Sequence, residues 1–411
     1  MKINGPSTGN RVNRFTDRRN PQPVNSVPLL DVNRGNEPLK SEVMELFSEI
    51  YDSGRFIGGP HVSNLEGNVA AVSHCEFGVG CASGSDALLL ALMALDIGPG
   101  DEVICPSFTF FATASCIHRL GATPVFADIE PDTFNIDVDS VARVVTGRTK
   151  AIIPVHLFGQ CANMDALVEL AQEFDLKIVE DCAQSIGATQ GGRAAGSIGD
   201  IGCFSFYPTK NLGGFGDGGM LTTNDEKIAD RLRLLANHGM RPRYYHREVG
   251  INSRLDSLQA AVLDLKIKRL AVYTANRKEN AIRYRQLFLQ SPLNSLVKLP
   301  ATSRDCGHVW NQFTIRIPGG KRDEIRKQLA DLNVGSEVYY PIPVHQQECF
   351  SYLEVGAEEL GETVRASTEV LSLPIFPELT FEEQVYVVES LEKVMGVYST
   401  EAQQPLIRKA A

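Results

Sequence analysis

One lysine of the chain stands in surroundings that suit covalent chemistry. Lys210 lies in the segment FSFYPTKNLGG, which covers residues 204–214 and continues as FGDGG, so aromatic residues and glycines surround it. Burial of such a lysine disfavours its ammonium form and lowers its pKa, and the free amine can then form a Schiff base with a carbonyl compound. A surface lysine in a glycine-rich loop is the simpler alternative, which this segment alone leaves open.

An acidic residue ends an apolar run upstream of this lysine. Asp181 lies in the sequence IVEDCAQ, at a place where a parallel sheet delivers residues to its ligand crevice. A carboxylate facing the pyridine nitrogen of pyridoxal phosphate keeps that nitrogen protonated, and the ring can then accept electrons. Viewed alone, Asp181 could equally cap the following helix.

A third piece is the sequence ASGSDAL over residues 82–88, where small hydroxyl residues precede a strong helical pattern. The backbone N–H groups and the dipole of such a helix start can bind a phosphate, although Ser and Asp also begin helices simply as caps. A strand-end acid, a lysine in a glycine-bounded turn and a phosphate-type helix start together suit one cofactor, pyridoxal 5'-phosphate.

These residues need a scaffold, and the hydrophobic pattern predicts an α/β fold. Four apolar runs, at residues 101–107, 123–129, 150–158 and 176–183, predict strands, while residues 83–95 and 164–174 predict helices. Strands that are apolar on both faces and alternate with helices indicate a mostly parallel sheet covered on both sides. Ligands of such a sheet bind at the carboxyl ends of its strands.

The chain is long enough for two domains. After a helical pattern at residues 253–270 come isolated signals, a strand over 310–317 and a helix over 321–332. Residues 1–26 are polar and lack apolar periodicity, so we expect a flexible tail there. We expect residues 27–265 to form a large cofactor-binding α/β domain and residues 266–411 to form a smaller C-terminal α/β domain.

Composition excludes several classes of protein. The 411 residues carry a formal net charge of −10, and no basic run is long enough to bind a nucleic-acid backbone. No apolar stretch is long enough for a membrane helix, and the N-terminus lacks a secretion signal, so we expect a cytoplasmic protein. Its 9 cysteines are scattered without a CxxC pair, which argues against a disulfide framework or a zinc site.

Several segments resemble the DegT/DnrJ/StrS family of pyridoxal-phosphate-dependent nucleotide-sugar aminotransferases of fold type I, from about Val27 to residue 395. The resemblance is carried by the lysine segment and by SGRFIGGPHVSNLE, GPGDEVICPSFTFFATA, AIIPVHLFGQCANMDAL, VEDCAQSIGA, GINSRLDSLQAA, YYPIPVHQQ and LSLPIFP. It implies a large domain with a mostly parallel sheet covered by helices, a smaller α/β domain, and a homodimer.

The resemblance also implies roles for particular residues. Lys210 would carry the cofactor as a Schiff base, and Asp181 would pair with its pyridine nitrogen. The other cofactor contacts implied are Gln184 near the ring hydroxyl, Phe110 stacked on the ring, Gly84, Ser85 and Ser205 on the phosphate, and Asn252 reaching that phosphate from the neighbouring subunit. Arg254, His345 and Tyr340 would line the substrate side, with His238 a weaker candidate, and each could instead satisfy loop carbonyls.

The implied substrates are a nucleotide-linked keto sugar and glutamate, which leaves as 2-oxoglutarate. The resemblance favours a 3-keto over a 4-keto sugar, including 3-keto uronic acids whose carboxylate Arg254 could bind. The nucleotide, UDP or dTDP, stays open. One alternative is a sugar dehydratase of this fold, in which histidine replaces Lys210, and another is a regulator that binds without turnover. A third is a nicotinamide dehydrogenase, but no G-x-G-x-x-G fingerprint follows the first strand and opens a helix here.

Overall fold

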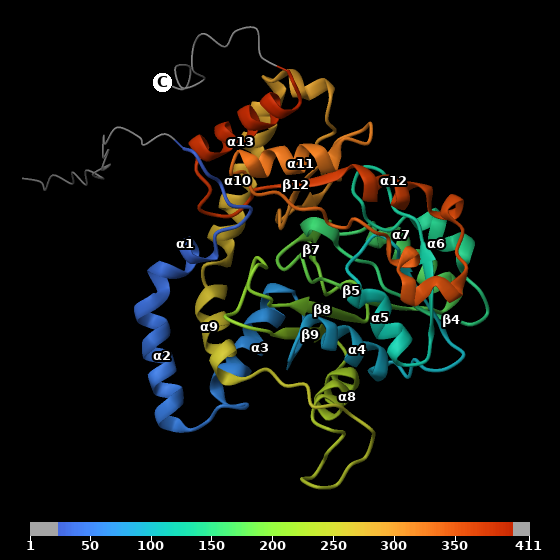
Figure 1. Cartoon of the computed structure of the whole chain (residues 1–411). Helices are drawn as coiled ribbons and strands as arrows, with labels where there is room; N and C mark the ends of the chain where they lie inside the picture. Colours follow the sequence, from blue (N-terminus) through green and yellow to red (C-terminus); the bar gives the residue numbers. More distant parts are fainter. Residues whose placement is uncertain (1–23, 398–411) are drawn as a thin grey trace, which may run out of the picture.

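The protein is described as a computed structural model covering residues 24–397, so most of the tail expected at residues 1–26, and residues 398–411, lie outside the described part. A seven-stranded sheet forms the centre of the molecule (Figure 1). In spatial order its strands are β1 (Phe77–Cys81), β9 (Gly219–Thr223), β8 (Ile201–Ser205), β5 (Lys177–Asp181), β4 (Thr149–Ile152), β2 (Glu102–Pro106) and β3 (Thr123–Ala127).

The sheet is mostly parallel, as the pattern predicts. Neighbouring strands from β3 through β2, β4 and β5 to β8 pair in parallel, whereas β9 runs antiparallel to both β8 and β1. Because parallel strands end at one edge of a sheet, Asp181 at the end of β5 and Ser205 at the end of β8 reach the same edge.

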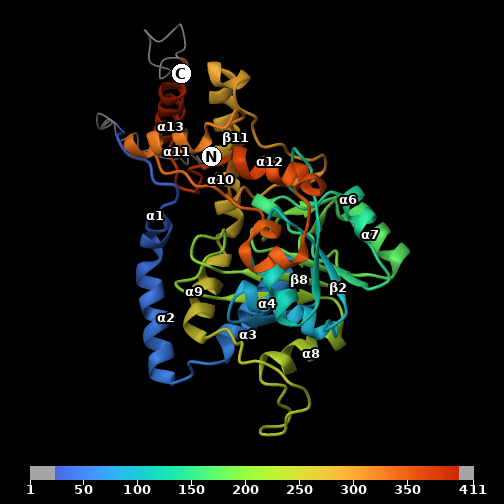
Figure 2. The ribbon, with the colours of Figure 1, turned by 45° about the vertical axis from the view of Figure 1, so that its right-hand side comes forward.

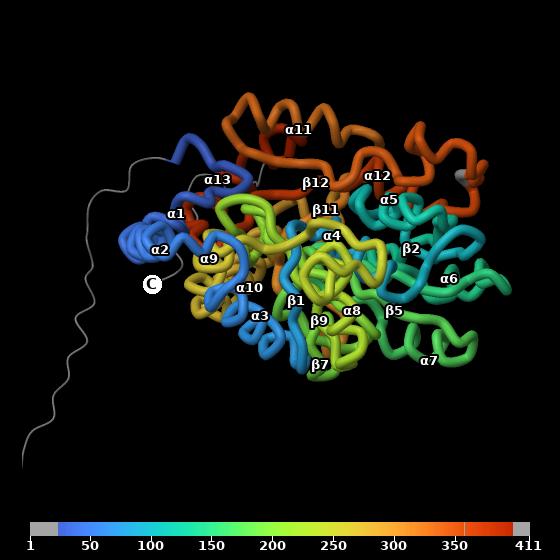
Figure 3. The backbone as a smooth tube through the Cα atoms, turned by 90° about the horizontal axis from the view of Figure 1, so that it is seen from below, coloured from blue at the N-terminus to red at the C-terminus, as the bar shows by residue number. Residues whose placement is uncertain are grey.

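Helices cover both faces of this sheet. Neighbouring residues of one strand point to opposite sides. In β2, Val103 and Cys105 therefore pack with α4 (Gly84–Ala94) and α5 (Ala112–Arg119), while Ile104 packs with α6 (Val138–Val144) and α7 (Met164–Phe174). The view from below shows α4 and α5 on one side and α3 and α7 on the other (Figure 3). The helices of this part are α3 (Pro60–Val72), α4 (Gly84–Ala94), α5 (Ala112–Arg119), α6 (Val138–Val144), α7 (Met164–Phe174), α8 (Glu226–Ala236) and α9 (Ser257–Ile267).

A second group of elements lies beside the sheet (Figure 2). It contains the antiparallel pair β11 (Phe313–Arg316) and β12 (Val370–Leu373) with α10 (Leu270–Leu289), α11 (Arg322–Asp331), α12 (Gly361–Glu369) and α13 (Phe381–Val394). The boundary expected between residues 265 and 266 falls in the last turn of α9. We retain the division into two domains as a proposal.

The N-terminal segment, residues 24–39, crosses between these two groups. Val27 is fully buried, and its N–H donates to the Asn333 carbonyl at 2.9 Å beside the bridge to Val334. The segment continues through α1 (Val32–Asn36) into α2 (Lys40–Ser53), which packs along α9 in both views (Figures 1 and 2).

The remaining short elements connect these parts. They are the strands β6 (Thr189–Gln190), β7 (Arg193–Ala194) and β10 (Cys306–Gly307), and the 3-10 segments at Glu37–Leu39, Leu157–Gly159, Pro292–Ser295, Val344–Gln346, Glu348–Leu353 and Ala357–Leu360. Over residues 24–397, no helix combines the length and the apolar character needed to cross a bilayer.

Candidate active site

The carboxyl edge of the sheet brings the lysine segment and the strand-end acid together. Asp181 and Cys203 are direct partners in the parallel pairing of β5 with β8, so Ser205 lies two residues further along β8, at the same edge of the sheet. The chain then turns, and the Lys210 N–H donates to the Tyr207 carbonyl at 2.8 Å. The turn places Lys210 close enough to Asp181 for the two charges to influence each other.

The amine of Lys210 is surrounded by protein, although the residue retains some solvent access. Burial lowers the pKa of Lys210 to about 8, and the negative charge of Asp181 opposes that change. A larger fraction of this amine is therefore neutral near pH 7 than for a lysine in water, which is the state that a nucleophilic amine requires.

Asp181 is buried and fixed by two hydrogen bonds. The Thr113 hydroxyl donates to Oδ2 at 2.9 Å, and the Ala183 N–H donates to Oδ1 at 3.1 Å. Burial raises the pKa of Asp181, while these hydrogen bonds and the positive charge of Lys210 act in the opposite direction. A cationic partner stabilises the charged form of a buried carboxylate, and a protonated pyridine nitrogen is such a partner.

The start of α4 lies directly against the end of β8. A Cβ added to Gly84 would come within 2.6 Å of the Ser205 Cβ, so only glycine permits this approach. Ser83 caps the helix, since its side chain accepts from the Asp86 N–H at 3.1 Å. Ser85, in the exposed first turn, and Ser205 therefore stand beside the positive end of the helix dipole, an arrangement that suits a phosphate.

Gln184 connects two segments at this edge. Its Oε1 accepts from the Phe158 N–H at 2.7 Å, and its Nε2 donates to the Tyr340 hydroxyl at 3.3 Å. The Phe110 ring, which is 58% exposed, lies with its centroid 6.3 Å from that of Tyr340. Tyr340, expected on the substrate side, thus lies next to two residues expected at the cofactor.

His345 is buried against the sheet rather than open to solvent. The Ser107 hydroxyl lies 2.6 Å from Nδ1 and accepts from the His345 N–H at 3.1 Å, and burial lowers the pKa of the ring. Its Nε2 is buried and has no hydrogen-bond partner within the described part of the chain. The ring thus contacts a side-chain hydroxyl and no loop carbonyl among the described residues, and the substrate-side role of His345 stays a prediction.

Asn252 and Arg254 lie apart from the buried set. Both are exposed on the segment between α8 and α9, where Arg254 donates to the Asn237 Oδ1 at 3.3 Å, and His238 is exposed on the same segment. Within residues 24–397, no hydrogen bond joins them to Lys210 or Asp181. In Figure 1 the middle of this segment projects below α8 and the chain then returns to α9. Residues 252–254 belong to the returning part, where Ser253 is buried and donates to Asp86 Oδ2 at 2.7 Å beside the start of α4.

Thr113 is a site residue that the sequence did not reveal. It lies in the segment FTFFATA at the start of α5, and nothing in the local pattern distinguishes the hydroxyl that reaches Asp181 from those that do not. Thr113 follows β2, which β4 separates from β5, so the contact of its hydroxyl with Asp181 becomes evident only once the order of the strands in the sheet is known.

A buried pair next to this site has a structural role. His156 Nε2 and Glu180 Oε2 are 2.8 Å apart, and Cys182 lies close enough to both that the three could in principle ligate a metal. Glu180 also accepts from the backbone N–H groups of residues 196, 198 and 199, and His156 Nδ1 accepts from the Ala162 N–H. Because these groups are already satisfied, we assign the pair to the core.

The residues present fit pyridoxal phosphate. A buried amine with a lowered pKa, a buried carboxylate and a helix start that only glycine allows against Ser205 all converge on one edge of the sheet. Fold and site together define a pyridoxal-phosphate-dependent aminotransferase of fold type I.

Comparison with known proteins identifies the group. The chain belongs to the DegT/DnrJ/EryC1/StrS aminotransferase family, whose model matches residues 38–392. The resemblance, the fold type, the cofactor and the enzyme class expected from the sequence are thereby confirmed, and the protein is a sugar aminotransferase.

Three relatives illustrate this similarity. A protein described as a pleiotropic regulatory protein, from Geobacillus stearothermophilus, is 47% identical over 366 residues, which cover 89% of this chain and 98% of the relative. The UDP-N-acetyl-3-dehydro-alpha-D-glucosamine 3-aminotransferase of Acidithiobacillus ferrooxidans is 44% identical, covering 88% and 95%. The crystal structure of S. venezuelae DesV superposes with a TM-score of 0.87 at 39% identity, covering 92% and 100%.

Proposed function

We propose that the protein transfers an amino group from glutamate to the keto group of a nucleotide-linked sugar, with a 3-keto sugar favoured over a 4-keto sugar, and that Lys210 and Asp181 carry the chemistry. The observation that carries this proposal is that the Lys210 amine is buried near the charged side chain of Asp181. Burial lowers the pKa of this amine to about 8. The preference for the 3-keto position is supported by the name of the Acidithiobacillus relative, a 3-aminotransferase of a 3-dehydro sugar.

The proposed roles follow from the chemistry of each group. Lys210, when neutral, would hold the cofactor covalently and, once freed, would move a proton at the substrate carbon. Proton transfer by a positioned base increases the reaction rate by a factor of about 10² to 10⁴. Asp181 would keep the ring nitrogen protonated. When bound, the cofactor supplies the electron sink for the carbanion next to the imine.

The other side chains would hold the cofactor in place. Gly84 and Ser85 at the start of α4 would bind its phosphate together with Ser205, Gln184 would lie near the ring hydroxyl, and Phe110 would stack on the ring face. The approach of Gly84 to Ser205 and the contact of Gln184 with Tyr340 support this assignment.

We further propose that the active enzyme is a homodimer with shared sites. Asn252 would reach the cofactor phosphate of the neighbouring subunit. Arg254, His345 and Tyr340 would line the substrate side of the site. The exposure of Asn252 beside the start of α4 supports this, because its side chain makes no hydrogen bond to Lys210 or Asp181 of its own chain within residues 24–397. Arg254 is the proposed partner of a uronate carboxylate.

The decisive experiment combines turnover with covalent trapping. Purified holoenzyme is incubated with glutamate and a panel of 3-keto and 4-keto sugars linked to UDP or dTDP, and 2-oxoglutarate is measured. In parallel, borohydride reduction followed by peptide mass spectrometry locates the pyridoxyl group, which we expect on Lys210. Lys210→Ala should abolish both signals while the exposed Lys268→Ala control keeps them. An adduct on another residue, or turnover by Lys210→Ala, would overturn the assignment.

A regulator that binds the cofactor without turnover is the second candidate, favoured by the description of the Geobacillus relative. The same assay separates the two functions. A regulator would still give the Lys210 adduct but would release no 2-oxoglutarate with any keto sugar. A dehydratase of this fold is disfavoured, because Lys210 occupies the position at which that class has histidine.

A further inference from the structure

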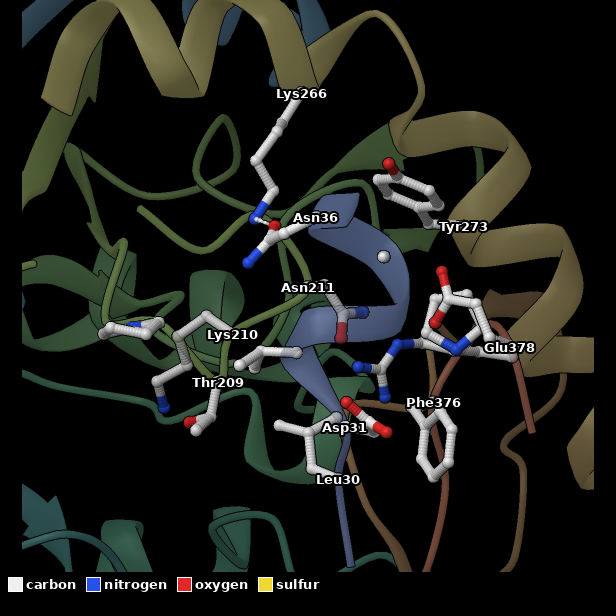
Figure 4. Close-up of a pocket in the computed structure, with 15 residues that line it drawn as sticks. Leu30, Asp31, Asn36, Thr209, Lys210, Asn211, Lys266, Tyr273, Phe376 and Glu378 are labelled. Carbon is white, nitrogen blue, oxygen red and sulfur yellow. Dashed lines mark hydrogen bonds between the residues drawn. The ribbon is translucent and has the colours of Figure 1, made fainter. Parts of the chain in front are cut away.

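Helix α9 holds the loop that follows Lys210 through a buried lysine. Lys266 is 8% exposed, and its amine donates to the Gly213 carbonyl at 2.5 Å and to the Asn36 side-chain oxygen at 3.2 Å. Figure 4 shows Lys266 directed at Asn36, while the Lys210 amine points away from this pair. The two lysines therefore lie on opposite sides of one loop.

The same face of α9 makes a second contact with this loop. Gln259 lies seven residues, or about two helical turns, before Lys266, so both side chains project from one side of the helix. Gln259 Oε1 accepts from the Phe215 N–H at 2.7 Å. The helix thus binds one backbone acceptor and one backbone donor, at Gly213 and Phe215.

The contact that holds the backbone of Gly213 also restricts Lys210, because the two ends of the loop that contains Lys210 touch each other. A Cβ on Gly213 would lie 2.3 Å from the Pro208 carbonyl oxygen, so the backbones at residues 208 and 213 touch and Lys210 lies between them. The following residue is held as well, since Asn211 Nδ2 donates to the Val309 carbonyl at 2.9 Å. The backbone of Lys210 has little freedom while these contacts persist.

Lys266 occupies this position at an energetic cost. Burial lowers the pKa of its amine to about 8, and among the described residues it forms no ion pair. An apolar side chain of similar length would avoid the desolvation cost of an amine. The contact with Gly213 is thus a feature that packing alone does not require.

We propose that Lys266, with Gln259 two turns earlier, positions Lys210 from the side of the loop that faces away from the cofactor. This inference rests on the proposed role of Lys210. It assigns no chemistry to Lys266 itself, which acts through the backbone of the loop.

The test is the titration of Lys210 in Lys266→Met. In the full-length protein freed of cofactor, the rate of acetylation of Lys210 is followed against pH by peptide mass spectrometry. A loosened loop lets water reach the amine, which reduces the effect of burial and therefore raises the pKa of Lys210. We expect a rise of about one unit, which is about tenfold less free amine at pH 7, and a lower kcat in the holoenzyme.

Controls separate positioning from general destabilisation. Lys268→Met changes an exposed lysine at the end of the same helix and should leave the titration unchanged. Lys266→Arg keeps a donor and should restore part of the wild-type titration. Gln259→Ala should raise the pKa of Lys210 by a smaller amount. If Lys266→Met does not fold, the Gln259→Ala variant tests the proposal in its place.

The outcomes are distinguishable. If the borohydride adduct forms on Lys210 but its titration is the same in wild type, Lys266→Met and Gln259→Ala, the positioning role is wrong and the proposed function stands. If the adduct forms elsewhere, the proposed function itself fails. A lower melting temperature with an unchanged Lys210 titration would make Lys266 purely structural and would also overturn the inference.

Discussion

The Thr113 hydroxyl donates a 2.9 Å hydrogen bond to Asp181 Oδ2, which connects the start of α5 to the end of β5 inside the buried site. Thr113→Val should therefore destabilise the charged form of Asp181 while preserving the shape of the side chain at position 113. A hydrogen bond to a charged group contributes about 1.5 to 3 kcal/mol, so we expect kcat/KM to fall roughly ten- to hundredfold. Thr109→Val removes the neighbouring hydroxyl, which lies 3.1 Å from that of Thr113 but makes no hydrogen bond to Asp181, so we expect a smaller loss. Equal losses in the two variants would refute a specific role for Thr113.

Gly84→Ala tests the phosphate-binding helix start. The new Cβ would lie 2.6 Å from the Ser205 Cβ, so the first turn of α4 must move away from β8. We expect the Kd for pyridoxal phosphate, measured by fluorescence titration, to rise by about tenfold or more, equivalent to about 1.4 kcal/mol. Gly361→Ala is the control, because Gly361 also begins a helix but has open space around its Cβ position. Unchanged affinity in Gly84→Ala would argue against this phosphate site.

The pKa of Lys210 predicts how cofactor capture depends on pH. Only the neutral amine reacts, and burial lowers its pKa to about 8, so the rate of capture by cofactor-free protein should rise as pH increases through about 8. The charge of Asp181 raises that pKa, so Asp181→Asn should move the midpoint to lower pH. Stopped-flow absorbance from pH 6 to 10 measures both profiles. A midpoint near the value of about 10.4 for a free lysine would contradict the burial of this amine.

Mixed dimers test whether the site is shared. Lys210→Ala and Asn252→Ala homodimers should each be nearly inactive. After random reassortment about half of the dimers are hybrids, and each hybrid has one intact site of two, so activity should recover to about a quarter of wild type. The recovery is measured as 2-oxoglutarate formation after mild dissociation and remixing. Absence of any recovery, with hybrids verified by mass spectrometry, would place Asn252 in the site of its own chain.

Much of the fold could be predicted because its strands and helices differ in hydrophobic period. The helix expected at residues 164–174 coincides with α7, and the runs at residues 101–107 and 176–183 contain β2 and β5. The antiparallel β9 could not be predicted in this way. A fully buried strand reads the same in either direction, and its orientation depends on how the chain returns to the sheet.

The site residues likewise include some that the local sequence predicts and some that it does not. Asp181 and Ser205 were predictable as neighbours, because each follows an apolar run or precedes a distinctive loop, and parallel strands end at one edge. Thr113 and Lys266 were not, since each acts through a contact between segments far apart in the chain. A hydrogen bond to a backbone carbonyl, such as that of Lys266 to Gly213, leaves no mark on local residue types.

The position of Val27 has a consequence for biosynthesis. Val27 emerges from the ribosome early in translation, whereas its partners Asn333 and Val334 emerge only near the end. Domains generally fold during synthesis from the N-terminus onward, yet residues 24–39 must wait for the C-terminal elements before they dock. Asn36, the second acceptor of Lys266, belongs to this late-docking segment. The nascent polypeptide therefore completes the support of its lysine loop only after nearly the whole chain has been made.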